Sequence, residues 1–584
     1  MNPSTLFFAE QLSKTTGLSL DEAQAAIEPT PNPELGDYAF GCFSLAKTLR
    51  KLPVQIAEDI VEKLPVGGPI VEATSAGPYV NVRINRKLMT AQVLGDVFSR
   101  TTRFGNSNVG KDELVVIDYS SPNVAKRFHV GHLSSTVIGG ALANMFECLG
   151  YSVLRINHLG DWGTQFGKLI VAFHNWGDDD ELKRAPIEHL EQLYVRFHTE
   201  AETQPELDDQ ARDWSRRLEE GDSDARELWQ LFRDVSIDEL EQIYKRLGVR
   251  FDHYHGEAFY EPLLNDTIDA VESSGQLELS DDAMVIKFPE SEDMPPMLLR
   301  RSDGATLYAT RDLAAAYYRW KTFKFTKCLY VVGQDQALHF KQLFTALEQL
   351  GCDWVDRVEH VGFGRVKGMS TRKGNVVLID DLLGRAVGRV EEIMKDNPDQ
   401  FSGIDDPEAV AEAVGVGAII FSTVSRRRMK DVEFDWDRAL NFQGETGPYL
   451  QYTHARMASI LRKASEVDPK EMAQLAALRD NDPELISKTV DISLITSDVE
   501  WAVIKELDRF ESQISSAADQ FDPSYVASYL IDLAAAANKF HYECRVINPD
   551  EPDLMKARLA LSEAIRQVLN NGLALLCLNA PERM

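Results

Sequence analysis

Residues 113–158 read ELVVIDYSSPNVAKRFHVGHLSSTVIGGALANMFECLGYSVLRINH. The stretch begins with a short apolar run at residues 114–118 and ends with a second run at residues 152–158. Between the two runs, apolar residues recur at helical spacing from residue 133 to residue 149, and Gly150 ends the pattern. A strand, a helix and a strand in this order form a βαβ unit, which implies a parallel sheet. The stretch therefore predicts an α/β, Rossmann-like domain.

The tetrapeptide His129-Val130-Gly131-His132 lies after the first predicted strand, at the start of the predicted helix. A helix N-terminus presents free N–H groups and the positive end of the helix dipole, which suit a chain of phosphates. Gly131 leaves room for a nucleotide to approach the backbone. His129 and His132 can donate hydrogen bonds to phosphate oxygens as charge builds at the α-phosphorus. The motif therefore predicts a nucleotide site with His129 and His132 as catalytic residues.

A second motif, GMSTRKGN, stands far downstream at residues 368–375. It is a glycine-flanked stretch that contains Arg372 and Lys373. A loop of this kind can close over a pyrophosphate leaving group and neutralise its charge. The alternative for the second motif alone is a solvated basic turn.

Together, the two motifs resemble the two signature sequences of a class I aminoacyl-tRNA synthetase. The flanking sequences, DYSSPNVAK at residues 118–126 and NHLGDWGTQFG at residues 157–167, resemble the arginyl-tRNA synthetase family. The resemblance covers nearly the whole chain. It implies an arginine–tRNA ligase that activates L-arginine with ATP and transfers the arginyl group to the 3′-terminal adenosine of tRNA(Arg), releasing AMP and diphosphate. ATP is then a substrate accompanied by Mg²⁺, and we expect no metal bound by the protein itself.

The resemblance also assigns roles around the phosphates. It implies that ATP is bound by both motifs, through His129, Gly131, His132, Met369, Ser370 and Thr371. Ser370, Arg372 and Lys373 are expected to act in catalysis. Thr371 stands where the common class I motif has its second lysine, and the resemblance implies that Lys126, ahead of the first motif, compensates. Either Lys126 or Lys373 supplies the main charge on the phosphates.

A guanidinium substrate requires carboxylates, since its planar fork of N–H donors is best met by a bidentate acid. Tyr308 and Asp312 are four residues apart and share one face if their segment is helical. The resemblance implies that Asp312 pairs with the guanidinium and that Tyr308 lies beside it. It adds three further residues of the arginine site: Gln336, and Asn123 and Asp118 for the α-amino end or the side chain. Ser134 departs from the family, which usually has arginine there.

The resemblance and the patterning together divide the chain into five parts. Residues 1–105 are expected to form a small α/β domain that contacts the tRNA elbow, and residues 106–175 and 300–385 the catalytic domain. Residues 176–299 are expected to be an insertion, residues 386–445 a stem-contact or connecting region, and residues 446–584 a helical anticodon-binding domain. In the last part, Tyr449, Tyr452 and Arg456 offer aromatic and cationic surface for unstacked bases. Packing of the tyrosines in the core is the alternative.

The composition is that of a multidomain chain with an acidic surface. It has 584 residues, 44% of them hydrophobic, and a net charge of −30. The six cysteines include no Cys-x-x-Cys pair, which argues against a zinc site of that type and favours reduced thiols. No secretory signal or membrane-spanning run is evident. We therefore expect a cytoplasmic monomer that does not bind membranes.

Taken alone, the net charge argues against a nucleic-acid partner, because affinity for phosphates comes from lysine and arginine. A large acidic protein can still carry a local basic surface. Residues 426–430, RRRMK, form such a cluster. Solvated charges on a helix face are the alternative explanation of this cluster.

Two other functions are compatible with parts of the sequence. Class I synthetases for cysteine or branched aliphatic amino acids would show zinc ligands or a large editing insertion, and this chain has neither. A non-catalytic relative that binds tRNA or a protein would not need an intact first motif, Lys126 and the Met-Ser segment. These features favour the arginine enzyme.

Overall fold

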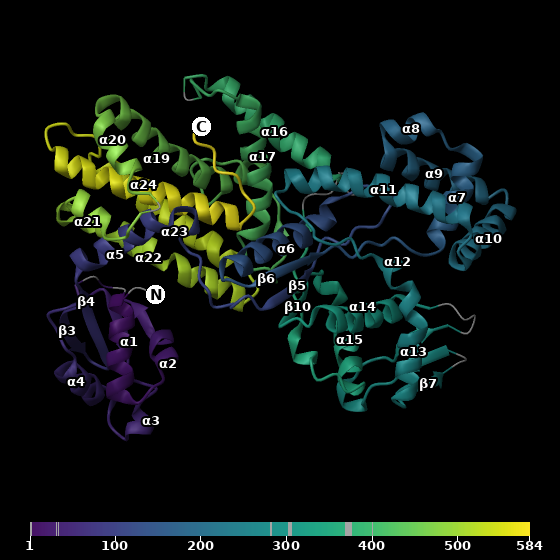
Figure 1. The fold of residues 1–584 in the computed structure, drawn as a ribbon, viewed down its shortest axis with the longest axis horizontal. Coiled ribbons are helices and arrows are strands. Elements are labelled where there is room, and N and C mark those ends of the chain that lie inside the picture. The colour runs from purple at the N-terminus through teal and green to yellow at the C-terminus, as the bar shows by residue number, and fades with distance from the viewer. Residues whose placement is uncertain are drawn as a thin grey trace.

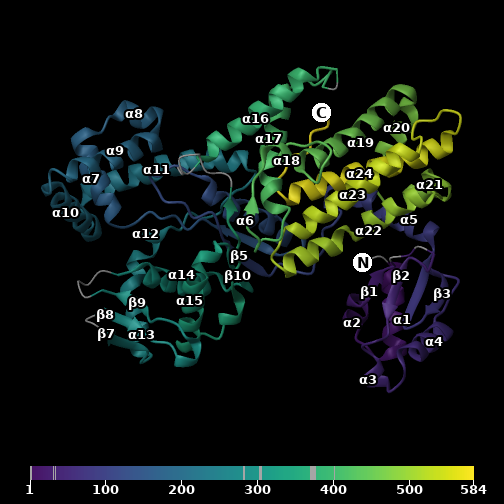
Figure 2. The ribbon, with the colours of Figure 1, turned by 180° about the vertical axis from the view of Figure 1, so that it is seen from behind.

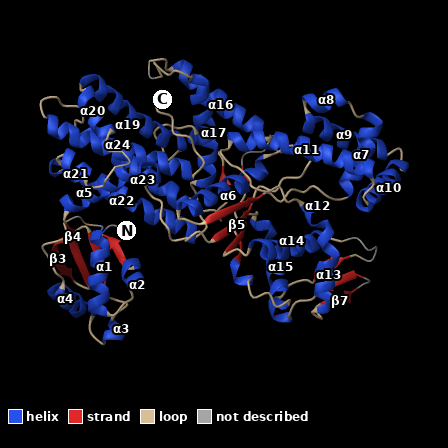
Figure 3. Ribbon diagram, in the orientation of Figure 1, coloured by secondary structure: helices blue, strands red, loops and turns tan. Residues whose placement is uncertain are grey.

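The structure, a computed structural model, describes residues 3–30, 32, 34–280, 283–301, 306–367, 377–399, 401–479 and 481–584. The molecule is elongated, and its lobes are arranged around a central sheet (Figure 1). The N-terminal domain and a C-terminal helical bundle lie on one side of that sheet. A group of helices and a smaller α/β lobe lie on the other side. The strands are concentrated in the N-terminal domain, the central sheet and the small lobe (Figure 3).

The central sheet is fully parallel, in the order β11-β10-β5-β6. Its strands are β5 (Leu114–Asp118), β6 (Ser152–Ile156), β10 (Lys327–Tyr330) and β11 (Val358–His360). Helix α6 (Val130–Cys148) connects β5 to β6, as the sequence pattern predicted. The side chains of β5 alternate between two cores, because successive residues of a strand point to opposite faces. Val115 and Ile117 pack in the core that contains α6, and Val116 packs in the core of α14 (Tyr308–Phe323) and α15 (Ala337–Gln349). The Rossmann-like fold class is therefore confirmed.

The N-terminal domain packs helices against a four-stranded antiparallel sheet in the order β1-β2-β4-β3. Its elements are α1 (Pro3–Thr16), α2 (Leu20–Ala25), β1 (Ile27–Pro29), β2 (Tyr38–Gly41), α3 (Ala46–Leu49), α4 (Pro53–Lys63), β3 (Ile70–Ala76) and β4 (Tyr79–Ile84). Helix α5 (Arg86–Arg100) leaves this domain and packs against the C-terminal bundle. Figure 2 shows the same arrangement from behind.

A helical group follows β6 in the chain. Its helices are α7 (Thr164–Trp176), α8 (Asp179–Arg184), α9 (Pro186–Ala201), α10 (Glu206–Glu220) and α11 (Ser223–Arg246). Helix α7 packs against α9, α10 and α11. The expected domain boundary at residue 175 therefore falls inside α7, and the helical group begins at the start of this helix.

The small lobe contains a sheet of its own that the sequence pattern did not predict. Three antiparallel strands lie in the order β7-β8-β9. The lobe is built from α12 (Glu257–Tyr260), α13 (Leu264–Ser273), β7 (Leu277–Ser280), β8 (Ala283–Ile286) and β9 (Met297–Arg300). Its apolar residues share one core with α14, α15 and the central sheet. The small lobe therefore supports the catalytic sheet directly.

The connecting region contains the most apolar helix. It comprises the end of α16 (Ile379–Asp396), α17 (Pro407–Val424), β13 (Val432–Glu433) and α18 (Trp436–Ala439), and β13 pairs with β12 (Val366–Lys367) of the preceding part of the chain. Within the described chain, α17 is the one helix long and apolar enough to cross a membrane, with a mean hydropathy of 1.4, but 61% of it is buried in the protein. It packs against α6, α16 and α19. Burial in the core accounts for its apolar sequence.

The C-terminal bundle is entirely helical, as predicted. It contains α19 (Gly447–Val467), α20 (Pro469–Ala476), α21 (Leu485–Thr489), α22 (Asp498–Asp519), α23 (Ser524–Glu543) and α24 (Pro552–Leu575). A buried hydrogen bond of 2.8 Å from Nε1 of Trp501 to the carboxylate of Asp37 joins the bundle to the N-terminal domain. The amide of Asn571 donates to the carbonyls of Thr101 and Phe104.

Candidate active site

A cleft of about 930 Å³ opens at the carboxyl ends of the central strands. The chain passes from β5 to β6 on one side, while β10 lies on the other side of β5. Open α/β sheets bind ligands at such a switch point. The volume suits a nucleotide with part of a second substrate. The cleft is lined by Ser120, Ser121, Val130, Gly131, His132, Ser134, Ser135, Val331, Val332, Gly333, Gln334, Asp335, Gln336, Phe363, Gly364, Arg365, Met429 and Asp431.

Two stacked histidines form the start of α6, with ring centroids 3.9 Å apart. Nδ1 of His129 accepts a hydrogen bond from the N–H of Gly131 (3.1 Å), and Nδ1 of His132 accepts one from the N–H of His129 (3.3 Å). Since each Nδ1 accepts, each neutral ring carries its proton on Nε2. Burial and the charge of His129 lower the pKa of His132 to about 3. Burial, with the charge of Lys126, also lowers the pKa of His129. Both rings are therefore neutral Nε2–H donors at neutral pH.

The second motif lies outside the described residues, and with it the expected positions Met369, Ser370, Thr371, Arg372 and Lys373. The segment that follows it is described and lies beside the first motif. The N–H of Val130 donates to the carbonyl of Val377, and the N–H of Ile379 donates to the carbonyl of Phe128, both at 3.1 Å. On the other flank, β12 pairs with β13 in parallel.

Asp312 lies in the first turns of α14, and α14 begins at Tyr308, so the two residues share the helix face that their spacing predicted. Oδ2 of Asp312 is 2.6 Å from Nε2 of His339, and the rings of Tyr308 and His339 are 4.9 Å apart. Burial raises the pKa of Asp312, but the hydrogen bond from His339 and the nearby charge of His158 outweigh burial and bring it below the usual value. Asp312 is therefore an ionised acceptor, and its side chain is 26% exposed.

Asp118 already has partners within the protein. Its Oδ2 lies 2.8 Å from Nη2 of Arg319, and its Oδ1 accepts a hydrogen bond of 3.2 Å from Oγ of Ser121. Asp118 is 5% exposed and Arg319 is fully buried. The carboxylate expected to hold the substrate is thus paired with an internal arginine that the sequence pattern did not single out.

Glu257 is a second carboxyl group beside Asp312 that the sequence analysis missed. Burial raises its pKa, the charges of His158 and Arg311 lower it by less, and the charge of Asp312 adds to the increase. No ion pair of its carboxylate occurs among the described residues. Glu257 has no spacing relation to either motif, so periodicity offered no signal for it. Only the fold brings it to α14.

The remaining expected residues fall in different places. Gln336 lies in the turn after β10 and lines the cleft with His132. Asn123 lies on the exposed loop after β5 and packs against Gly160, where an added Cβ would be 2.1 Å from its Oδ1. Nζ of Lys126 lies 5.9 Å from the ring centroid of Tyr194 on α9, so its side chain is directed toward the helical group.

A second hollow, of about 550 Å³, lies on the C-terminal bundle. The guanidinium carbon of Arg456 is 4.7 Å from the ring centroid of Tyr452 on the same helix. Tyr449 is half-buried and accepts a hydrogen bond of 3.0 Å from the amide of Asn538. Arg456 donates to the same amide. The hollow is lined by Ser402, Gly403, Ile404, Tyr452, Ala455, Arg456, Ser459, Ile460, Arg462, Lys463, Glu466, His541, Arg583 and Met584. Most of its charged side chains are basic.

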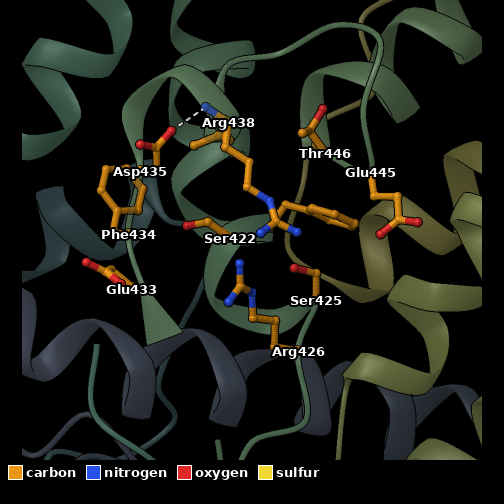
Figure 4. Close-up of a pocket in the computed structure, with 13 residues that line it drawn as sticks. Ser422, Ser425, Arg426, Glu433, Phe434, Asp435, Arg438, Glu445 and Thr446 are labelled. Atoms are coloured by element: carbon orange, nitrogen blue, oxygen red, sulfur yellow. Dashed lines mark hydrogen bonds between the residues drawn. The ribbon is translucent and has the colours of Figure 1, made fainter. Parts of the chain in front are cut away.

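A smaller pocket lies where α17, the β13–α18 segment and the start of α19 meet. Figure 4 shows the side chains of Arg426 and Arg438 directed into it, with Glu433 and Glu445 at its rim. Its volume is about 40 Å³, which holds about one water molecule. It is too small for ATP or arginine and belongs to the junction of the domains.

Three families match the chain in sequence. Residues 94–436 match "tRNA synthetases class I (R), catalytic domain". Residues 450–584 match "DALR anticodon binding domain". Residues 7–84 match "Arginyl tRNA synthetase N terminal domain".

Relatives of similar length match from end to end. The arginine–tRNA ligase of Alkaliphilus metalliredigens is 43% identical, over 99% of this chain and 100% of its own. That of Clostridioides difficile is 43% identical over 98% of both chains. Among solved structures, the arginyl-tRNA synthetase of Thermus thermophilus matches with a TM-score of 0.76 and 26% identity over 99% of both chains. That of Plasmodium falciparum, at 24% identity, shares the fold with a TM-score of 0.79 over 100% of this chain and 98% of that chain.

A histidine-capped helix at the switch point of a parallel sheet, followed by a helical anticodon-binding domain, defines a class I aminoacyl-tRNA synthetase. The identity extends over all three matched regions and over the full length of the relatives. The chain belongs to the arginyl-tRNA synthetase family.

Proposed function

We propose that this chain is an arginine–tRNA ligase that uses ATP. The observation that carries the proposal is identity of 42–43% over nearly the whole length of relatives named arginine–tRNA ligase. A carboxylate of α14, Asp312, beside the buried Glu257 supports the choice of a cationic amino acid.

The first step joins arginine to the nucleotide. A carboxylate oxygen of L-arginine attacks the α-phosphorus of ATP, the bond to the β-phosphate oxygen breaks, and pyrophosphate leaves. The triphosphate lies at the N-terminus of α6, where Nε2–H of His129 and of His132 donates to its oxygens, and Gly131 allows close approach. In this proposal the phosphate site is completed by Lys126 and by residues of the second motif: Met369, Ser370, Thr371, Arg372 and Lys373.

In the second step, a hydroxyl of the terminal adenosine of tRNA attacks the activated carbonyl, and AMP leaves. The protein positions the reactants and stabilises phosphate charge. The Mg²⁺ that accompanies ATP would neutralise phosphate charge, and the carboxylates of Asp335 and Asp431 on the cleft lining would hold it through water.

In this proposal the arginine subsite is built around the first turns of α14. Asp312 and Glu257 accept the N–H groups of the guanidinium, and Tyr308 lies beside it. Gln336, at the cleft, and Asn123, on the loop after β5, bind the end of the substrate that carries the α-amino group. The arrangement gives the cation two acceptors, which is the geometry that a guanidinium prefers.

The tRNA contacts are distributed along the elongated molecule. The anticodon binds in the basic hollow of residues 446–584, at Tyr452 and Arg456, with Tyr449 beside it. The elbow binds to residues 1–105, where Phe43 (56% exposed) and Tyr79 (43% exposed) form an edge-to-face pair at 5.5 Å. Exposed aromatic rings of this kind stack on unpaired bases.

The remaining expectations are part of the same proposal. We expected residues 106–175 and 300–385 to form the catalytic domain, residues 176–299 the insertion and residues 386–445 the connecting region. Because α7 packs with the helical group, the proposal moves the boundary before the insertion to the start of this helix. The protein acts as a monomer in the cytoplasm.

Two assays test the proposal. The first measures ATP–pyrophosphate exchange with each amino acid, with and without tRNA. The second measures charging of tRNA(Arg). Arginine should support charging far better than lysine, citrulline or any other amino acid. Comparable charging by another amino acid would overturn it.

A further inference from the structure

The loop after β5 has an unusual backbone conformation where it borders the catalytic cleft. Ser120, Ser121 and Ala125 have φ angles of +75°, +52° and +59°, in the left-handed region that residues with a side chain rarely adopt. Ser121 also precedes Pro122, and a residue before proline prefers extended backbone. Ser120 and Ser121 line the cleft, and Asn123 follows them in the same loop. Such a conformation persists only if contacts elsewhere in the protein impose it.

Tyr244, on α11 of the helical group, supplies the central contact. Its Oη lies 2.9 Å from Oγ of Ser120 and accepts a hydrogen bond of 2.9 Å from the side-chain amide of Asn157. Oδ1 of the same asparagine accepts a hydrogen bond of 3.1 Å from the N–H of Ser121. Tyr244 is 2% exposed and Asn157 is fully buried, so bulk water does not compete for these bonds. One phenol hydroxyl is thus connected to both serines of the left-handed pair.

A second hydroxyl of α11 holds the other end of the loop. Oγ of Ser236, a fully buried residue, accepts a hydrogen bond of 3.1 Å from the N–H of Ala125. The same hydroxyl donates to the carbonyl of Phe232 at 2.6 Å, which fixes its orientation. Ser236 and Tyr244 are eight residues apart, so they lie on one face of the helix. This face of α11 therefore contacts each left-handed part of the loop.

The end of α11 is fixed to other elements, so the helix can act as a rigid support. The guanidinium of Arg246 contacts Glu412 of α17 at 2.8 Å and Asp380 of α16 at 3.0 Å. The ring of Tyr244 packs against that of Phe251, with centroids 4.8 Å apart. These contacts restrict the position from which the phenol hydroxyl reaches the loop.

Helix α6 holds the same loop from another side. The N–H of Ser120 donates to Oγ of Ser135 at 2.8 Å, and Oγ1 of Thr136 lies 2.9 Å from Oγ of Ser120. The loop is therefore clasped between α6, which belongs to the catalytic domain, and α11, which belongs to the insertion.

We propose that Tyr244 and Ser236 are positioning residues that hold residues 120–125 in the left-handed conformation required for arginine activation. They act through the loop, without contact to either substrate. Without the two hydroxyls, the serines and Ala125 relax toward extended backbone, and Asn123 is displaced with them. The inference rests on the proposed function, which supplies the assay, and it gives the insertion a part in building the arginine site.

Tyr244→Phe removes the central hydroxyl and little else. In tRNA charging, kcat/KM for arginine should fall about tenfold or more, because a displacement of about 1 Å can cost about 100-fold in rate. KM for tRNA should stay within about twofold of wild type. Ser236→Ala should lower kcat/KM for arginine in the same selective way. A wild-type kcat/KM in both variants would overturn the proposal.

Glycine substitution separates positioning from a merely structural role. Ser120→Gly and Ser120→Ala both remove the serine hydroxyl, but only glycine adopts left-handed backbone without a steric cost. Added to Tyr244→Phe, Ser120→Gly should therefore give a kcat/KM for arginine at least about fivefold above that of Ser120→Ala in the same background. Equal values for the two double variants would overturn the proposal. If Tyr244→Phe does not fold, Ser236→Ala with Ala125→Gly as its rescue decides the matter in the same way.

Tyr529→Phe is the matched control. Tyr529 is 1% exposed, and its hydroxyl donates to the carbonyl of Glu506 at 2.9 Å within the C-terminal bundle. Both tyrosine variants should lower the melting temperature, since each removes a buried hydrogen bond. Tyr529→Phe should leave kcat/KM for arginine at the wild-type value. An equal loss in the two variants would show that any buried tyrosine hydroxyl has the effect.

Hydrogen exchange of the enzyme without substrates provides a readout that needs no activity. The amides of Ser120, Ser121 and Ala125 are bonded to side chains, and they should exchange faster in Tyr244→Phe while the bundle exchanges as in wild type. Unchanged exchange of these amides would overturn the proposal. Failure of the wild-type protein to charge tRNA(Arg) would instead refute the proposed function and leave the exchange result standing, so the two failures are distinguishable.

Discussion

The pKa values of Asp312 and Glu257 shift in opposite directions although the two carboxyl groups lie close together. The hydrogen bond from His339 helps to hold the pKa of Asp312 below its ordinary value despite burial, whereas burial raises the pKa of Glu257. Two neighbouring carboxyl groups cannot both ionise easily without a cation. A bound guanidinium supplies that cation, so substrate binding and full ionisation of the pair are linked.

The charge of Asp312 should dominate arginine recognition. Asp312→Asn keeps the shape but removes the charge, and losing one partner of a close ion pair costs about 2–5 kcal/mol. KM for arginine should rise far more than KM for ATP. Asp356→Asn, an exposed aspartate on the same domain, should change neither. Equal effects of Asp312→Asn on both substrates would contradict the assignment.

Glu257 should make arginine binding depend on pH. A raised carboxyl pKa means that falling pH removes the negative charge earlier than for an ordinary glutamate. KM for arginine should therefore increase as pH falls from about 8 to about 5.5. Glu257→Gln should raise KM about 10-fold or more at pH 8 and flatten this dependence. A variant that keeps the wild-type pH profile would exclude Glu257 from the site.

At the scale of secondary structure elements, backbone N–H groups in the first turn of α6 hold the rings of the two histidines in place. The ring of His129 accepts from Gly131, so the conformation of this turn and the orientation of the ring depend on each other. In the bundle, helix α19 positions Tyr452 and Arg456 at the basic hollow.

Gly131→Ala should disturb the histidines. An added Cβ would lie 2.8 Å from Cε1 and 2.9 Å from Nδ1 of the His129 ring, which must then move. Since a misplacement of about 1 Å can cost about 100-fold in rate, kcat should fall by about 10- to 100-fold, with KM for arginine little changed. Gly384→Ala in α16 meets no atom within 4 Å and should leave kcat at the wild-type value. A wild-type kcat in Gly131→Ala would show that the backbone at Gly131 does not constrain the catalytic histidines.

Arg456→Ala should weaken tRNA binding in a salt-dependent way. If Arg456 neutralises one phosphate, the slope of log affinity against log salt should decrease by about 1. Arg216→Ala, on the exposed surface of α10, serves as the control and should leave both affinity and slope unchanged. Identical behaviour of the two variants would place the tRNA elsewhere.

At the scale of the whole molecule, one short segment joins the catalytic cleft to the bundle. The carbonyl of Arg428 accepts from the N–H of Gly364, and the N–H of Arg428 donates to the buried Asp522 at 3.3 Å. The guanidinium of Arg427 lies 3.9 Å from the ring centroid of Tyr525 on α23. If the bundle moves when tRNA binds, these contacts would transmit the movement to the edge of the cleft.

Arginine activation should accordingly require tRNA, a requirement that the family resemblance also implies. Pyrophosphate exchange with ATP and arginine alone should be near background and appear when tRNA(Arg) is added, through preferential binding to the active state. The stimulation should fall steeply with salt. Robust exchange without tRNA would show that the two parts are not coupled in this way.

The sequence by itself determined the βαβ unit, the parallel sheet, the helical bundle and the face shared by Tyr308 and Asp312, because these depend on local periodicity and on motifs with fixed spacing. It also led to the right family. It did not predict the small sheet of β7–β9, whose strands are only four residues long and too short for a periodic pattern to stand out. Nor did it predict the pairing of Asp118 with Arg319 or the approach of Glu257 to Asp312. These contacts join residues far apart in the chain, and only the packing of α14 against the sheet and α12 decides which charges meet and which of them are left for the substrate.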